Sequence, residues 1–259
     1  MGSFLEVEKL TKVFGGLTAV REVGFKMGRD EMVGLIGPNG SGKTTFVRLI
    51  IGMLKADSGL IRFKGENILG QPPWEIVKKG IALTHQVVRP FREMPIIANA
   101  MIGCLGSGRK RGEWVKRIES KAMDALEFCG ISDLAMERAS ILSHGELKRL
   151  EIARALATEP ELLILDEPFA GLDPQETELM AKSLKRLNKG GRFGRLHSEG
   201  PAMLIVEHKL SELMKIVNRV IVLNYGEMIA EGTPFEIVNN PKVIQVYVGY
   251  GSRGDQIAS

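Results

Sequence analysis

The N-terminal part of the chain alternates apolar and polar residues with a period of two. Residues 4–9 and 19–26 both follow this pattern, and the glycine pair Gly15-Gly16 lies between them. Alternation of this kind is typical of half-buried strands, and glycine between two such runs favours a turn. The pattern therefore predicts an N-terminal antiparallel β subdomain.

Through most of the remaining chain, short apolar runs alternate with segments of helical period. The predicted strands cover residues 32–36, 60–64, 81–84, 161–166, 202–206 and 219–224, with a turn at 57–59. The predicted helices cover residues 44–52, 72–80, 145–157, 174–187 and 210–217. Repeated strand–helix units indicate an α/β fold with a mainly parallel sheet, whose ligands bind at the carboxyl ends of the strands.

Residues 87–140 show no strand pattern. Their apolar side chains recur at helical spacing, as in Ile118, Ala122 and Ala125, which predicts helices. We therefore expect an inserted α-helical subdomain over 87–140 within a single domain of residues 1–259. The basic run 106–111 is interpreted as a solvated loop or a partner contact, and the Gly/Arg/Ser-rich segment 188–200 has no predicted role.

Composition sets limits on function. Of the 259 residues, 44% are hydrophobic and 25% are charged, and the net charge of +4 is too small to indicate nucleic-acid binding. Cys104 and Cys129 do not form a CxxC motif, so reduced thiols are expected. The apolar runs are too short to cross a bilayer, so a role at a membrane would depend on partner proteins.

A phosphate-binding motif follows the predicted strand 32–36 and opens the helix predicted at 44–52. The run Gly37-Pro38-Asn39-Gly40-Ser41-Gly42-Lys43-Thr44 fits the P-loop pattern G-x-x-x-x-G-K-[ST]. In a P-loop the backbone N–H groups surround phosphate oxygens, the lysine reaches the β- and γ-phosphates, and the final hydroxyl binds Mg²⁺. The expected nucleotide-binding residues are Gly37, Asn39, Gly40, Ser41, Gly42, Lys43, Thr44 and Thr45, with Thr44 also a metal ligand.

Two carboxylates follow the apolar run 162–165. Beside a P-loop, one such carboxylate can hold Mg²⁺ through water, and a second can polarise the water that attacks the γ-phosphate. We assign Asp166 to the metal and Glu167 to the water. A surface pair at a strand end would be an equally good interpretation without the P-loop.

With these residues in place, the chain resembles the ATP-binding subunits of ABC transporters over nearly its whole length. The most specific mark is Leu142-Ser143-His144-Gly145-Glu146, which resembles the signature loop of that family. The resemblance implies that Ser143 and Gly145 face the γ-phosphate across a dimer. The commonest form of the loop is Leu-Ser-Gly-Gly-Gln, so His144 and Glu146 depart from it. We expect His144 to point away from the nucleotide and Glu146 to accept, but not donate, a hydrogen bond.

The remaining family motifs follow in order. Gln86 resembles the catalytic Q-loop glutamine that touches Mg²⁺ or water, Asp173 resembles the D-loop aspartate at the dimer interface, and His208 resembles the switch histidine that holds the γ-phosphate. Phe14 resembles the aromatic residue on which adenine stacks. Val13 and Phe25 are the other apolar candidates nearby.

The resemblance also implies cofactors, partners and a location. ATP and Mg²⁺ are expected between the P-loop of one subunit and the signature loop of another, in a head-to-tail dimer with itself or with a paralogue. Integral membrane permease subunits are the expected partners, and an extracytoplasmic solute-binding protein is an indirect one. The chain would then lie peripherally at the cytoplasmic face of the cell membrane, as a single ABC ATP-binding domain.

Several segments resemble the subunits that serve branched-chain amino-acid importers, namely 91–94, Gly232-Thr233-Pro234, Asn240-Pro241 and Tyr247-Val248-Gly249. Ser143-His144-Gly145 also resembles the related urea importers. We therefore expect an ATP-hydrolysing motor that powers import of a small polar solute, with branched-chain amino acids as the expected solute, through partner membrane permeases. The alternatives are a soluble ABC-type ATPase of DNA repair or translation, a nucleotide switch without hydrolysis, and the motor of a lipopolysaccharide-type exporter. Glu167 and His208 argue against the switch.

Overall fold

The structure is a computed structural model that describes residues 3–85, 88–104, 113–190 and 200–251. It divides into two compact units, one formed by Met1–Gln71 with Ile205–Ser259 and the other by Pro72–Leu204. Gln86, the basic run 106–111 and most of the segment 188–200 lie outside the described residues. Within the described ranges, no helix is long and apolar enough to span a bilayer.

The first unit begins with an antiparallel sheet in the order β2-β1-β4-β5. Strands β1 (Leu5–Phe14) and β2 (Leu17–Met27) form a hairpin in which Leu5 pairs with Met27 and Phe14 pairs with Leu17. Strands β4 (Ser58–Phe63) and β5 (Glu66–Asn67) complete this sheet. The predicted N-terminal antiparallel subdomain is therefore confirmed.

The turn predicted at 57–59 is wrong, because Ser58 and Gly59 already belong to β4. A Cβ at Gly59 would lie 2.6 Å from the Cα of Leu10 on β1, and its φ of +111° is one that other residues rarely adopt. The pairing of β1 with β4 shifts register between Glu8 and Thr11. Glycine is therefore used here for close approach of two strands, not for a turn.

The first unit also contains part of a second sheet, in the order β10-β9-β3. Strand β3 (Met32–Ile36) pairs in parallel with β9 (Arg219–Asn224), and β10 (Glu227–Gly232) pairs with β9 in antiparallel fashion. Helix α7 (Leu210–Ile216) packs on β3, and helix α1 (Lys43–Ile50) packs against β2. Helices α8 (Pro234–Val238) and α9 (Pro241–Gly251) pack on β10. The bounds of β3 and β9 match the prediction, whereas β10, α8 and α9 were not predicted.

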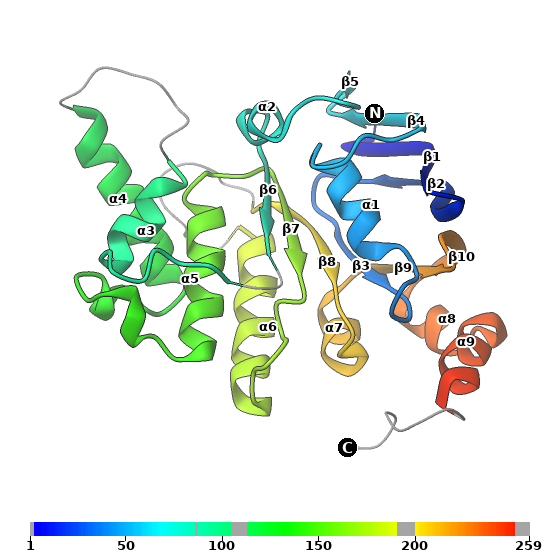
Figure 1. The fold of residues 1–259 in the computed structure, drawn as a ribbon. Coiled ribbons are helices and arrows are strands. Elements are labelled where there is room, and N and C mark those ends of the chain that lie inside the picture. Colours follow the sequence, from blue (N-terminus) through cyan, green and yellow to red (C-terminus); the bar gives the residue numbers. More distant parts are fainter. Residues whose placement is uncertain (1–2, 86–87, 105–112, 191–199, 252–259) are drawn as a thin grey trace. The chain divides into compact units, whose positions relative to one another are not determined.

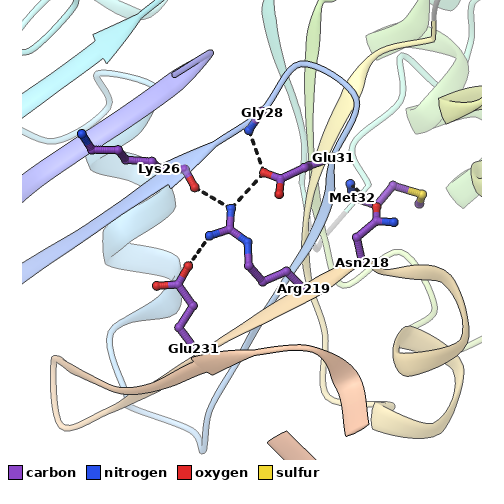
Figure 2. Close-up of polar contacts among 7 residues, drawn as sticks. All are labelled: Lys26, Gly28, Glu31, Met32, Asn218, Arg219 and Glu231. Carbon is purple, nitrogen blue, oxygen red and sulfur yellow. Dashed lines mark hydrogen bonds and ion pairs between the residues drawn. The ribbon is translucent and has the colours of Figure 1, made fainter. Parts of the chain in front are cut away.

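A polar cluster around Arg219 ties these strands together (Figure 2). The guanidinium of Arg219, at the start of β9, donates to the carboxylate of Glu31 at 2.9 Å, to the carboxylate of Glu231 on β10 and to the carbonyl O of Lys26 on β2. Glu31 in turn accepts from the N–H of Gly28 at 2.6 Å. One arginine therefore joins the end of the antiparallel sheet to two strands of the second sheet.

The second unit carries strands in the order β8-β7-β6. Strands β6 (Ile81–Thr84) and β7 (Leu162–Asp166) are parallel, and β8 (Ala202–Val206) ends in the first unit. All residues of β7 and β8 are buried. Burial on both faces explains why these strands are continuous apolar runs in the sequence.

The helical part of the second unit contains α3 (Ile96–Ile102), α4 (Glu113–Phe128) and α5 (His144–Leu156), which lie side by side (Figure 1). The regularly spaced side chains of Ile118, Ala122 and Ala125 are buried among them. Two 3-10 turns, Ser132–Leu134 and Ala139–Ile141, lie between α4 and α5. Helix α2 (Pro73–Lys78) packs on β6, and α6 (Pro174–Asn188) follows β7. A helical insert is thus present, as predicted.

Candidate functional site

The predicted P-loop connects β3 to α1, which is the strand–loop–helix order that the motif requires. Its last glycine, Gly42, is the N-cap of α1 and has a φ of 103°. A Cβ at this position would lie 2.3 Å from the carbonyl O of Ala19 on β2, so a larger residue would displace the loop. No side chain caps α1. The cap residue therefore supplies no side-chain acceptor to the first N–H groups of this helix, an arrangement that favours a bound phosphate.

Lys43 lies inside this loop and is only 6% exposed. Its Nζ donates to the carbonyl oxygens of Gly37 at 2.7 Å and Pro38 at 2.9 Å, and it lies 3.4 Å from the Oγ of Ser41. A phosphate carries full negative charge and is a stronger acceptor for an ammonium group than a carbonyl oxygen. The lysine is therefore held where it can transfer its hydrogen bonds to a phosphate.

Two segments that the sequence analysis did not assign hold the P-loop in place. In the turn between β9 and β10, the N–H of Gly226 donates to the carbonyl O of Ser41 at 3.0 Å, and its carbonyl O accepts from the N–H of Arg21 at 2.7 Å. From α9, the hydroxyl of Tyr247 accepts from the N–H of Gly37, while burial raises the pKa of Tyr247 to about 12. The C-terminal tail therefore supports the first glycine of the loop.

The three candidates for adenine stacking differ in exposure. Phe25 is buried and packs on Phe46, with ring centroids 5.8 Å apart. Phe14 is 44% exposed at the end of β1, and the Nζ of Lys12 lies 5.3 Å from its ring centroid. Stacking needs an aromatic ring with an open face. Phe14 has such a ring, whereas Phe25 does not and Val13 has no ring.

His208 is exposed just after β8, and the preceding residue fixes its turn. The carboxylate of Glu207 is buried and accepts hydrogen bonds from the N–H of His208 at 2.8 Å and the N–H of Lys209 at 3.1 Å. The N–H of Glu207 lies 3.4 Å from the carbonyl O of Leu35 at the end of β3. His208 therefore leaves the sheet close to the strand that leads into the P-loop.

In the second unit, the two predicted carboxylates leave β7 in different ways. Asp166 is buried, and its N–H donates to the Oγ1 of Thr84 on β6 at 3.3 Å. Glu167 has a φ of 52°, which is uncommon for a residue other than glycine. Its carbonyl O accepts from the N–H of Ala170 at 3.2 Å and from the Nζ of Lys148 at 3.3 Å. Such backbone conformations cluster at functional sites.

The signature loop begins α5 with a capping box. The Oγ of Ser143 accepts from the N–H of Glu146 at 3.3 Å, and the carboxylate of Glu146 accepts from the N–H of Ser143 at 2.8 Å. These hydrogen bonds hold the pKa of Glu146 below its ordinary value. Glu146, which stands where the usual loop has glutamine, thus forms the second half of the capping box.

The D-loop packs directly on the signature loop. Asp173 caps α6 through a second capping box with Glu176. The Nε2 of His144 lies 3.3 Å from the carbonyl O of Ala170, and a Cβ at Gly171 would lie 2.4 Å from the same nitrogen. The unusual histidine of the signature loop therefore contacts the backbone of the D-loop.

The predicted site residues fall into two groups. Phe14, the P-loop with Thr45, and His208 belong to the first unit, and Ser143, Gly145, Asp166, Glu167 and Asp173 belong to the second. Gln86 lies outside the described residues. The sequence analysis missed the supporting residues Glu207, Lys148, Glu151 and Tyr247. Of these, only Glu207 could have been suspected, from a charge placed directly after the apolar run 202–206.

Comparison with known proteins identifies two matching families. Residues 20–170 match the family described as ABC transporter, and residues 227–251 match the family described as branched-chain amino acid ATP-binding cassette transporter.

Individual relatives and solved structures agree with this match. The probable branched-chain amino acid transport ATP-binding protein LivG of Archaeoglobus fulgidus is 38% identical over 253 residues, which is 95% of each chain. The high-affinity branched-chain amino acid transport ATP-binding protein LivG of Escherichia coli K12 is 38% identical over 256 residues, covering 95% of this chain and 97% of its own. The ADP conformation of MJ1267, an ATP-binding cassette of an ABC transporter, is similar with a TM-score of 0.83 at 31% identity, covering 96% of this chain and 100% of that one.

Proposed function

The chain belongs to the ATP-binding proteins of ABC transporters, in the branched-chain amino-acid group, and from this premise we propose that it powers the import of branched-chain amino acids. Its relatives are transport proteins for these solutes. They favour this reading over a soluble ABC-type ATPase, a urea importer or a lipopolysaccharide exporter. The chain is an ATP hydrolase of the ABC type.

The observation that carries the ATP-binding role is the start of α1. A helix that has no side-chain cap, that follows glycines and that starts with a buried lysine donating to loop carbonyls offers a triphosphate both N–H donors and a cation. We assign phosphate binding to Gly37, Asn39, Gly40, Ser41, Gly42, Lys43, Thr44 and Thr45. Phe14 would stack on adenine, because of the three candidates it alone has an exposed aromatic ring.

Mg²⁺ fits the donors that the chain offers. Thr44 and Asp166 supply oxygen ligands, which Mg²⁺ prefers, and Gln86 would add a third. In the described residues, no three His, Cys, Asp or Glu side chains form a metal-binding group. That suits an ion whose coordination is completed by the nucleotide phosphates and water. When bound, the ion would neutralise phosphate charge and so favour the attack of water.

Hydrolysis would depend on residues of both units. Glu167 would orient and polarise the attacking water, His208 would hold the γ-phosphate, and Gln86 would contact the metal or the water. The buried carboxylate of Glu207 supports His208 by accepting from its N–H. Glu167 is supported by the hydrogen bonds that its own carbonyl O accepts. Most of the rate enhancement would then come from positioning and charge stabilisation.

ABC cassettes dimerise and work with transporter partners. For this chain, we propose a head-to-tail dimer with itself or a paralogue, in which Ser143, Gly145 and Asp173 of one subunit meet the nucleotide of the other. Membrane permease subunits would be direct partners, and an extracytoplasmic solute-binding protein an indirect one. The chain would then lie at the cytoplasmic face of the cell membrane.

Glu167→Gln tests the hydrolytic role together with the dimer. The substitution keeps the size of the side chain and removes the charge that polarises water, so turnover should fall by about 10²- to 10⁴-fold while ATP still binds. Bound ATP that is not hydrolysed should favour the closed dimer by mass action. On a sizing column, the variant should run as a dimer with ATP and as a monomer with ADP or without nucleotide.

The matched control is Glu167→Gln combined with Ser143→Arg, which places bulk where the γ-phosphate meets the partner and should stay monomeric with ATP. Rapid ATP hydrolysis by the single variant would remove Glu167 from the catalytic role. A single variant that binds ATP and remains monomeric would contradict self-pairing and leave the paralogous dimer.

A further inference from the structure

Helix α5 buries charged residues on the side that faces the catalytic segments. His144, Lys148 and Glu151 are spaced four and three residues apart, so they share one face of the helix. Lys148 is 4% exposed and Glu151 is 7% exposed. Charged side chains are almost never buried to this degree unless they have partners. The groups that Lys148 and Glu151 bind should therefore show why these charges are buried.

Each of these three residues contacts the main chain of a different catalytic segment. The ring of His144 lies against the carbonyl O of Ala170 in the D-loop, at 3.3 Å. The Nζ of Lys148 donates to the carbonyl O of Glu167 at 3.3 Å. The carboxylate of Glu151 accepts from the N–H of His85 at 3.3 Å, directly before Gln86. All of these atoms belong to the second unit.

The contact with Glu167 has the clearest chemical consequence. Glu167 has a φ of 52°, so its peptide is held in a conformation that most residues avoid. Its carbonyl O accepts from the N–H of Ala170 and from the ammonium of Lys148. A hydrogen bond from a charged donor is stronger than one from a neutral donor. Lys148 therefore helps to fix the peptide from which the carboxylate of Glu167 projects.

We propose that Lys148 is a positioning residue for ATP hydrolysis. It joins the peptide of Glu167 to helix α5, and this helix starts with the signature loop. This inference rests on the proposed catalytic role of Glu167. Since Ser143 begins the same helix, a movement of α5 caused by nucleotide at the signature loop shifts the peptide of Glu167 with it. On the same face of α5, His144 connects the helix to the D-loop, and Glu151 connects it to His85, the residue before Gln86.

The test is Lys148→Met, with single-turnover ATP hydrolysis, ATP affinity and melting temperature measured on the full chain. Met fills similar volume and removes the donor, so kcat should fall about tenfold or more because the carboxylate is misplaced. ATP affinity should stay within about twofold, since the P-loop is untouched. A cooperative melting transition well above the assay temperature shows that the variant is folded. Lys148→Arg keeps a charged donor and should restore most of kcat.

Lys121→Met is the matched control, because Lys121 is also largely buried and pairs with Glu159, at 2.5 Å, away from the catalytic segments. It should leave kcat within about twofold of the parent. If Lys148→Met does not fold, Lys148→Gln replaces it in every measurement. Normal kcat in the folded Lys148 variant would overturn the inference.

A double variant separates this inference from the proposed function. In a Glu167→Gln background, Lys148→Met should cause no further loss of single-turnover rate, because the two residues act as a unit. An equal loss in both backgrounds would show that Lys148 acts independently of Glu167 and would overturn the inference alone. Rapid turnover by Glu167→Gln itself would overturn the catalytic role of Glu167 and the inference with it.

Discussion

The contact between the signature loop and the D-loop can be tested by adding a single methyl group at Gly171. Its φ of +76° is a left-handed value, and an added Cβ would lie 2.4 Å from the Nε2 and 2.6 Å from the Cδ2 of His144. Gly171→Ala therefore introduces two separate penalties. One is backbone strain, and the other is a steric conflict with the histidine ring.

The two penalties have different magnitudes. A residue with a Cβ in the left-handed region costs roughly 1–2 kcal/mol. The ring of His144 is the end of a flexible side chain and can move away, but it then loses its 3.3 Å contact with the carbonyl O of Ala170. An exposed hydrogen bond of this kind contributes about 0.5–1 kcal/mol. We therefore expect Gly171→Ala to lower the free energy of unfolding by about 2 kcal/mol.

The assay is a double-mutant cycle with His144→Ala, measured by urea unfolding and by ATPase rate. In the His144→Ala background only the strain term remains, so Gly171→Ala should be less destabilising there by about 0.5–1 kcal/mol. The ATPase rate lost by Gly171→Ala should also recover in part, because the D-loop no longer meets the ring. Equal destabilisation in both backgrounds, or none in either, would refute the proposed contact.

Two further predictions concern the caps and the strand junction. The hydrogen bonds from Ser143 hold the pKa of Glu146 below its ordinary value of 4.5, so the stability that this carboxylate contributes is present above that pH and is lost as the pH falls through the lowered pKa. The urea midpoints of parent and Glu146→Gln should therefore differ at about pH 7 and converge once the pH is below the lowered pKa. Arg219→Met leaves Glu31 and Glu231 without their shared cation and should lower the free energy of unfolding by about 1–3 kcal/mol, whereas Arg21→Met, which breaks an exposed pair with Glu227, should cost under about 1 kcal/mol by the same denaturant assay.

Much of the fold could be predicted because its strands are short apolar runs bounded by turns. The predictions for 32–36, 81–84, 202–206 and 219–224 agree with the strands in the structure. These segments are buried on both faces, so few polar residues interrupt their pattern. Strand β10 escaped prediction because most of its residues are only partly buried and include two glutamates.

The supporting residues of the site were harder to predict for a different reason. Lys148 and Glu151 bind main-chain atoms of Glu167 and His85, which lie far from them in the sequence. Every residue has a backbone carbonyl group, and every residue except proline also has a backbone N–H. The sequence therefore gives no sign of which backbone group a side chain will bind. From charge alone, both residues would be placed on the solvated face of α5. Only the fold shows that this face is buried.

The helices of this molecule begin in two ways. Helices α5, α6 and α8 each begin with a capping box, in which Ser143, Asp173 or Thr233 satisfies the first N–H groups. Helix α1 has Gly42 as its N-cap and no side-chain cap, and α2, α3 and α7 also lack a side-chain cap. A glycine N-cap costs only about a few tenths of a kcal/mol relative to a side-chain cap, so the deficit at α1 is small and a bound phosphate can remove it. The signature loop and the D-loop are therefore capped within the chain, whereas the helix after the P-loop offers its first N–H groups to a phosphate.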